Sequence, residues 1–158
     1  GRRLSGNGAV TSEFFTHLAA YEERPDVHAV VHAHPPKAVA ASLAGLSLAE
    51  PVLPELLLTI GGIPTVPYAT PATGAGGEAI RGIIRSCDAL IIARHGTLTV
   101  GRDVFEAYHK LEKLEHAAEI ILWASLLGPP AALPEAEVER LYRLQETYNP
   151  GTRLFRPD

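Results

Sequence analysis

The spacing of apolar and polar positions along the 158-residue chain predicts helices interspersed with short strands. Phe14, Leu18 and Tyr21 recur at helical spacing after Thr11–Ser12–Glu13, where a hydroxyl can cap the first free amides. Arg24–Pro25–Asp26 is expected to end this first helix. Further helices are predicted over 37–46, 78–86, about 103–127 and 134–148. The long fourth helix is expected to bury a face made of Phe105, Leu111, Leu114, Ala118, Ile121, Leu122 and Ser125.

Strands are predicted where β-branched and apolar residues run together between turn signals. VHAVVHAH (27–34) and ALIIARHG (89–96) are two such runs, and TLTVG (97–101) follows the second as its hairpin partner. PTVPY (64–68) suggests one brief strand in a segment otherwise broken by prolines and glycines. Because strands and helices do not alternate regularly, the pattern predicts an α/β fold with a helix-covered sheet that is at least partly antiparallel.

Composition argues against nucleic-acid and membrane partners and indicates a reducing compartment. The formal net charge is -4, from 14 basic and 18 acidic residues, and no basic stripe for a nucleic acid is present. No apolar stretch is long enough to span a bilayer, so no membrane association is expected. The single cysteine, Cys87, fits a reducing compartment, and a cytoplasmic location is expected. Methionine is absent, so residue 1 is not expected to be a natural start.

Three histidines form a candidate metal site. His32 and His34 share one face of a predicted strand, with Cα atoms about 7 Å apart, so two imidazoles can converge on one ion. A pair of solvated histidines beside a turn is the alternative. His95 favours the metal, because it ends a second apolar strand and Gly96 leaves room for a ligand or another backbone. Three histidines would leave a fourth position open for substrate, and imidazole ligation favours zinc, although another divalent metal is possible.

Glu13 is the candidate acid/base beside that site. It lies in the first turn of its predicted helix, where the free amides and the helix dipole stabilise a carboxylate. An ordinary N-terminal helix acid is the alternative interpretation. Thr11 and Ser12 can bind an anion such as phosphate or simply cap the helix. His17 follows Glu13 by four residues and so lies on the same helical face.

Three motifs in fixed order carry a resemblance to a known family. TSE, VVHAHPP and ARHGTLTVG resemble the class II aldolase/adducin family, and within it the aldolases of L-fuculose 1-phosphate. The separations of 19 residues from Glu13 to His32 and 63 from His32 to His95 match those of the family. The resemblance implies a three-layer α/β/α fold with a mainly antiparallel central sheet. It also implies a single domain over residues 1–158 that lacks the family's N-terminal segment.

The resemblance also implies roles for named residues. It makes His32, His34 and His95 zinc ligands and Glu13 the proton-transfer residue. Thr11 and Ser12 would contact the substrate phosphate, and Tyr148 would protonate the aldehyde end. The family is typically a homotetramer with sites at subunit interfaces.

The implied activity is that of a lyase in carbohydrate metabolism. A phosphorylated ketose of the L-fuculose 1-phosphate type would be cleaved to dihydroxyacetone phosphate and an aldehyde through a metal-stabilised enediolate. A pentulose-phosphate 4-epimerase, a sugar-phosphate dehydratase and a non-catalytic adducin-like assembly domain are the alternatives. Leu53 stands where the aldolases carry a tyrosine, and Gly6–Asn7–Gly8 is too close to Glu13 to be the family's upstream phosphate motif. The sugar is therefore left open.

Overall fold

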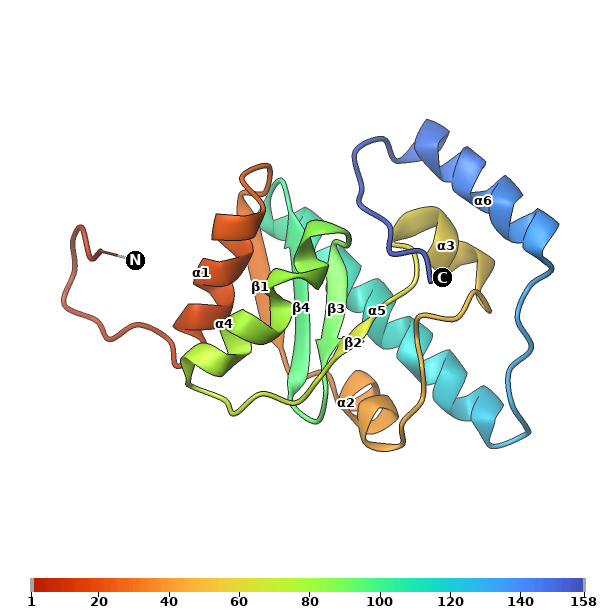
Figure 1. The fold of residues 1–158 in the computed structure, drawn as a ribbon, viewed down its shortest axis with the longest axis horizontal. Helices are drawn as coiled ribbons and strands as arrows, with labels where there is room; N and C mark the ends of the chain where they lie inside the picture. The colour runs from red at the N-terminus through yellow and green to blue at the C-terminus, as the bar shows by residue number, and fades with distance from the viewer. Residues whose placement is uncertain (1, 158) are drawn as a thin grey trace.

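A four-stranded mixed sheet lies at the centre of the computed structural model, which describes residues 2–157. The strand order is β1 (Ala29–Ala33), β4 (Gly96–Gly101), β3 (Ala89–Ile92) and β2 (Thr65–Val66). β4 pairs antiparallel with both β1 and β3, whereas the short β2 pairs parallel with β3 (Figure 1). The predicted helix-covered, mainly antiparallel sheet is confirmed.

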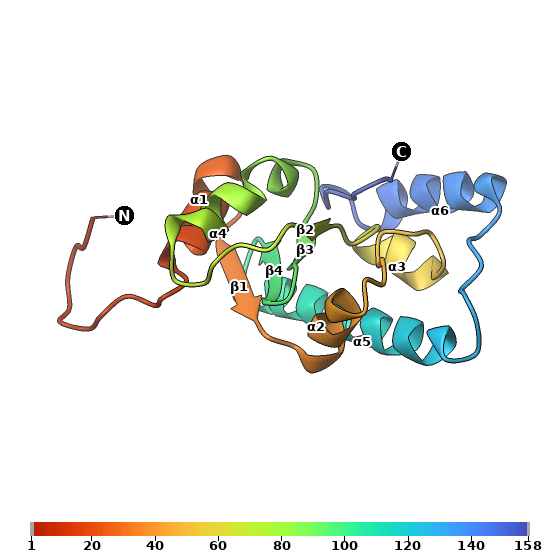
Figure 2. The ribbon, with the colours of Figure 1, turned by 60° about the horizontal axis from the view of Figure 1, so that its bottom comes forward.

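Helices cover both faces of this sheet, which gives the expected three layers (Figures 1 and 2). One face carries α1 (Phe14–Glu23), α4 (Gly74–Arg81) and a 3₁₀ turn, η1 (Ile83–Arg85). The other face carries α2 (Pro36–Leu43) and α5 (Val104–Ser125). Beside the β2 edge, α3 (Pro54–Thr59) packs against α6 (Glu135–Tyr148). No helix in the 2–157 range has both the length and the apolar character needed to cross a bilayer.

The strand β3 divides the hydrophobic core in two. All four of its residues are buried, and successive side chains point to opposite faces. Leu90 and Ile92 pack beneath α1 and α4, whereas Ala89 and Ile91 pack against α2 and α5. The sheet is therefore buried on both sides, which explains the uninterrupted apolar run in the sequence.

Three expectations about the elements are wrong. The helix expected over 78–86 begins at Gly74, capped by the Thr73 side chain, and ends at Arg81 before the 3₁₀ turn. The strand expected over 89–96 ends at Ile92, because the chain turns through Arg94 with φ +63°. Phe105, expected on the buried face of the long helix, is 71% exposed.

Lys110 is buried on that face of α5 instead, and its charge is neutralised within the fold. Its ammonium donates to Asp88 at 2.8 Å and to Glu106 at 2.8 Å. Asp88 also accepts a hydrogen bond from the buried Arg24 at 2.8 Å. Each buried charge therefore has a partner, and the network joins the end of α1 and the start of β3 to α5.

Candidate metal centre

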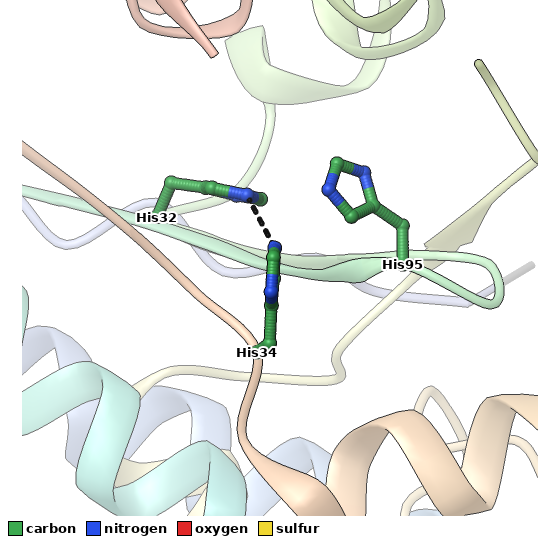
Figure 3. A group of neighbouring side chains, drawn as sticks. All are labelled: His32, His34 and His95. Carbon is green, nitrogen blue, oxygen red and sulfur yellow. Dashed lines mark hydrogen bonds between the residues drawn. The ribbon is translucent and has the colours of Figure 1, made fainter. Parts of the chain in front are cut away.

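The three candidate ligands meet at one end of the sheet. His32 lies on β1, opposite Leu98 of β4, and His34 follows directly after β1. His95 does not end a strand as expected. It lies in the turn between β3 and β4, where its backbone amide donates to the Ile92 carbonyl at 3.1 Å. One nitrogen from each imidazole lies within 4.8 Å of the other two (Figure 3).

Gly96 permits the close approach of β1 that this arrangement needs. A Cβ at this position would lie 2.5 Å from the Ala33 carbonyl oxygen and 2.6 Å from Cδ2 of His34. The space predicted beside Gly96 is therefore occupied by another backbone and by one candidate ligand ring.

The hydrogen bonds of His32 leave one of its nitrogens free to bind a metal. Its Nδ1 lies 2.9 Å from the Thr97 carbonyl oxygen, which can only accept a hydrogen bond. Nδ1 therefore carries the proton in the neutral ring, and Nε2 keeps its lone pair. That Nε2 lies 3.1 Å from Nε2 of His34. Two nitrogens bonded to one tetrahedral zinc at about 2.0–2.1 Å would be roughly 3.4 Å apart, so this pair is spaced as zinc ligands are. His95 brings a third nitrogen within 4.8 Å of the other two.

The environment favours the neutral rings of His32 and His95, which is the form that binds metals. Burial, with the nearby charges of His95 and His34, lowers the pKa of His32 to about 4. Burial also lowers the pKa of His95. The Glu13 carboxylate opposes both shifts. Neutral imidazoles of His32 and His95, with a carboxylate beside them, suit a divalent cation.

Glu13 lies at the edge of the histidine cluster. It is the N-cap residue of α1, and its side chain is only 11% exposed. Its Oε2 lies 4.0 Å from Nε2 of His95, while its Oε1 accepts a hydrogen bond from the Ala72 backbone amide at 3.1 Å. A carboxylate in this position can exchange a proton with a molecule bound at the cluster. Sequence reasoning did not identify Ala72.

His17 lies near this group, and within residues 2–157 its ring makes no hydrogen bond to Glu13, although its backbone amide donates to the Glu13 carbonyl at 3.2 Å. Its ring lies 6.4 Å from that of His32, edge to face, and burial lowers its pKa. His17 therefore packs beside the cluster.

The hydroxyl residues before α1 are open to solvent. Thr11 and Ser12 are both exposed, and the Thr11 hydroxyl accepts a hydrogen bond from the Glu13 amide at 3.3 Å. Glu13 is itself the N-cap residue and, among the described residues, α1 has no side-chain cap hydrogen bond, so the expected cap by Thr11 or Ser12 is wrong. Both residues remain exposed to a ligand.

Tyr148 is not brought to the cluster within one chain. It ends α6, is 73% exposed, and lines a cavity of about 550 Å³ together with Gly101 and Arg102. Gly101 ends β4, whereas His95 precedes its first residue. Six strand residues span about 17–20 Å, so Tyr148 lies at the opposite end of the sheet.

Known proteins resemble this chain in sequence and in fold. Residues 1–122 match the family described as "Class II Aldolase and Adducin N-terminal domain". The chain is 30% identical over 149 residues to 5-deoxy-D-ribulose 1-phosphate aldolase of Bacillus thuringiensis serovar kurstaki, covering 94% of this chain and 69% of that protein. It is 32% identical over 125 residues to 3-oxo-tetronate 4-phosphate decarboxylase of Escherichia coli K12, covering 77% of this chain and 58% of that protein.

Solved structures agree with the sequence relatives. A structure of L-fuculose 1-phosphate aldolase superposes with a TM-score of 0.80 at 26% identity, covering 89% of this chain and 66% of that one. The family match, the sequence relatives and the shared fold agree, and the chain belongs to the class II aldolase and adducin family.

Proposed function

We propose that this protein is a zinc-dependent aldolase that cleaves a phosphorylated ketose of the L-fuculose 1-phosphate type to dihydroxyacetone phosphate and an aldehyde. The observation that carries the proposal is the convergence of His32, His34 and His95 with the Glu13 carboxylate 4.0 Å from His95. The relatives named for aldolase activity on sugar phosphates support the substrate class.

Each residue of the cluster has a distinct part in this reaction. His32, His34 and His95 would hold the divalent metal, which when bound supplies Lewis-acid stabilisation of negative charge on the substrate. Cleavage leaves the carbon of the dihydroxyacetone phosphate half with an electron pair, delocalised as an enediolate. Glu13 delivers a proton to that carbon and takes it back in the condensing direction.

The remaining predicted site residues complete the proposal. The exposed hydroxyls of Thr11 and Ser12, next to Glu13, would bind the substrate phosphate. Tyr148 would reach the site of another copy, since it lies at the opposite end of the sheet in its own chain. This agrees with a homotetramer whose sites lie at subunit interfaces. We also propose that residues 1–158 belong to one domain; its two terminal residues lie outside the described part of the chain.

Decarboxylation is the second candidate reaction, because a relative named 3-oxo-tetronate 4-phosphate decarboxylase is 32% identical. Loss of carbon dioxide beside a carbonyl also leaves an electron pair on carbon that needs the same charge stabilisation and a proton donor. The two reactions differ in the bond broken and not in the residues that this site offers.

Metal content and turnover of variants test the site. The purified full-length protein is expected to contain one zinc per chain, measured by inductively coupled plasma mass spectrometry. His34→Ala should lose the metal, whereas Glu13→Gln should keep it and lose turnover by 100-fold or more, roughly the contribution of a general acid–base. His109→Ala, on the exposed face of α5, is the matched control and should change neither the zinc content nor the turnover. Wild-type activity without metal would refute the metal proposal, and an active Glu13→Gln would refute the acid/base role.

A panel of substrates separates the two reactions. The zinc-loaded protein is incubated with L-fuculose 1-phosphate, 5-deoxy-D-ribulose 1-phosphate and 3-oxo-tetronate 4-phosphate. Release of dihydroxyacetone phosphate from either ketose phosphate supports the aldolase. Release of carbon dioxide from the oxo acid alone would assign the decarboxylase instead.

A further inference from the structure

Backbone strain marks both flanks of the histidine cluster. Among residues 2–157, only Ala72 and Arg94 have a positive φ without being glycine, at 61° and 63°. Arg94 directly precedes His95, and Ala72 donates to Glu13. Left-handed backbone is unfavourable for both residue types, so it persists only where surrounding contacts enforce it.

Contacts from two helices enforce the turn at Ala72. The Thr73 hydroxyl donates to the Thr70 carbonyl at 2.7 Å and accepts from the Ala75 amide at 3.2 Å, which ties the turn to the start of α4. α4 in turn packs unusually close to α1. A Cβ at Gly77 would lie 2.8 Å from the Phe15 carbonyl oxygen. The turn is therefore held at a fixed distance from the start of α1, where Glu13 lies.

The consequence is a single, directed hydrogen bond to Glu13. The Ala72 amide donates to Oε1 at 3.1 Å, and it is the one donor to this carboxylate found in the described chain. The other oxygen, Oε2, is thereby turned toward His95, 4.0 Å away. A glutamate side chain has three rotatable bonds, and without this contact its carboxylate would be free to leave the orientation in which it faces the cluster.

We propose that Ala72 is a positioning residue, whose strained backbone amide orients Glu13 so that one carboxylate oxygen faces the substrate carbon. The inference rests on the proposed function, because it assigns a purpose to Ala72 only if Glu13 moves the proton. In that step Glu13 Oε2 accepts a proton from the carbon of dihydroxyacetone phosphate, the C–H electron pair remains on the substrate as an enediolate, and the carboxylate becomes a carboxylic acid. Loss of orientation should slow this transfer and leave substrate binding intact.

Replacing the peptide bond between Pro71 and Ala72 by an ester tests the proposal, because an ester has no N–H. The probe is dihydroxyacetone phosphate in D₂O, with exchange of its carbon-bound hydrogen followed by NMR in the full-length, zinc-loaded protein. The maximal exchange rate should fall by about 10- to 100-fold, as expected for a misplaced catalytic group. The KM for dihydroxyacetone phosphate and the zinc content should not change. If Ala72 has only a structural role, the exchange rate, the KM and the zinc content should change together, or the exchange rate should stay at the wild-type value.

Two genetically encoded variants provide a simpler comparison. Ala72→Val places a β-branched residue where it cannot hold positive φ, so it should displace the amide and reduce exchange as the ester does. Ala72→Gly keeps both the amide and the conformation and should retain the wild-type rate. Gly82→Ala, at the other end of α4, adds a methyl group that meets nothing within 4 Å in the described chain, so it is the matched control and should also retain the wild-type rate.

A measurement without turnover completes the test. In the metal-free protein, the Ala72 amide proton should be protected from solvent exchange, and Glu13→Ala should remove the protection. If Glu13→Gln still exchanges dihydroxyacetone phosphate, the proposed function fails at the acid/base step. If Glu13→Gln is inactive while the ester exchanges at the wild-type rate, only the role of Ala72 is overturned.

Discussion

At the scale of single residues, the imidazole of His32 links the candidate metal site to the stability of the fold. Its pKa falls to about 4 in the metal-free protein, mainly through burial, while the unfolded value is near 6.5. Between these values the unfolded chain binds a proton that the folded chain does not. Stability of the metal-free protein should therefore fall as the pH drops from about 6.5 to about 4, by at most roughly 1.4 kcal/mol per pH unit for one group.

Urea denaturation in the presence of a chelator, from pH 7.5 to pH 4.5, measures this loss. His32→Asn should reduce the slope of the profile without abolishing it, because burial also lowers the pKa of His95 and of His17. His109→Asn, at an exposed position, should leave the profile unchanged. The Asp26 carboxylate affects stability only at lower pH. Hydrogen bonding to Arg24 lowers the pKa of Asp26 to about 2, so its contribution to the free energy of unfolding is lost only below about pH 4. A profile that stays flat between pH 6.5 and 4.5 would contradict the assigned shift.

Single residues also show how far this site follows from sequence. The convergence of His32 and His34 follows from strand periodicity alone. The link from Glu13 to His95 came only from the resemblance to a family, because the contact joins distant segments. The turn at Ala72 could not be found at all, since alanine does not signal left-handed backbone as glycine would.

At the scale of elements, α4 shows why local propensity was misleading. Its first residues, Gly74–Ala75–Gly76–Gly77, disfavour a helix, and sequence reasoning started the helix four residues too late. Two of these glycines are required by packing and not by the helix itself. A Cβ at Gly76 would lie 2.7 Å from the Thr16 hydroxyl, and Gly77 meets the α1 backbone. The packing of α4 against α1 therefore outweighs the low helix propensity of these glycines.

A matched pair of substitutions on α4 tests this packing. Gly77→Ala should destabilise the protein by about 1–3 kcal/mol, because the new methyl group must displace the Phe15 carbonyl or the helix. Gly82→Ala, where a Cβ meets nothing within 4 Å and φ is -67°, should instead stabilise by about 0.4–1 kcal/mol. Thermal denaturation of both variants measures the difference. Equal effects of the two substitutions would show that α4 does not depend on close contact with α1.

At the scale of the whole molecule, the chain divides its chemistry between two ends of one sheet. The histidine cluster and Glu13 lie where β4 begins, and Tyr148 lies near the cavity where β4 ends. Sequence order could not reveal this separation, because the resemblance places residues in a site without saying which copy supplies them. If Tyr148 acts in the reaction, its hydroxyl must come from a second chain.

Subunit mixing tests this prediction. His34→Ala and Tyr148→Phe should each be strongly impaired alone, since one lacks a metal ligand and the other the tyrosine hydroxyl. In co-expressed hybrids, an intact site forms where a Tyr148→Phe chain supplies the histidine cluster and a His34→Ala neighbour supplies the tyrosine. Each condition holds for about half of the sites in an equal mixture, so about a quarter of the wild-type activity should return. His34→Ala mixed with Glu13→Gln is the control, because both changes affect one cluster and no hybrid site regains it. Equal activity in the two mixtures, or full activity of Tyr148→Phe alone, would show that the tyrosine does not cross between chains.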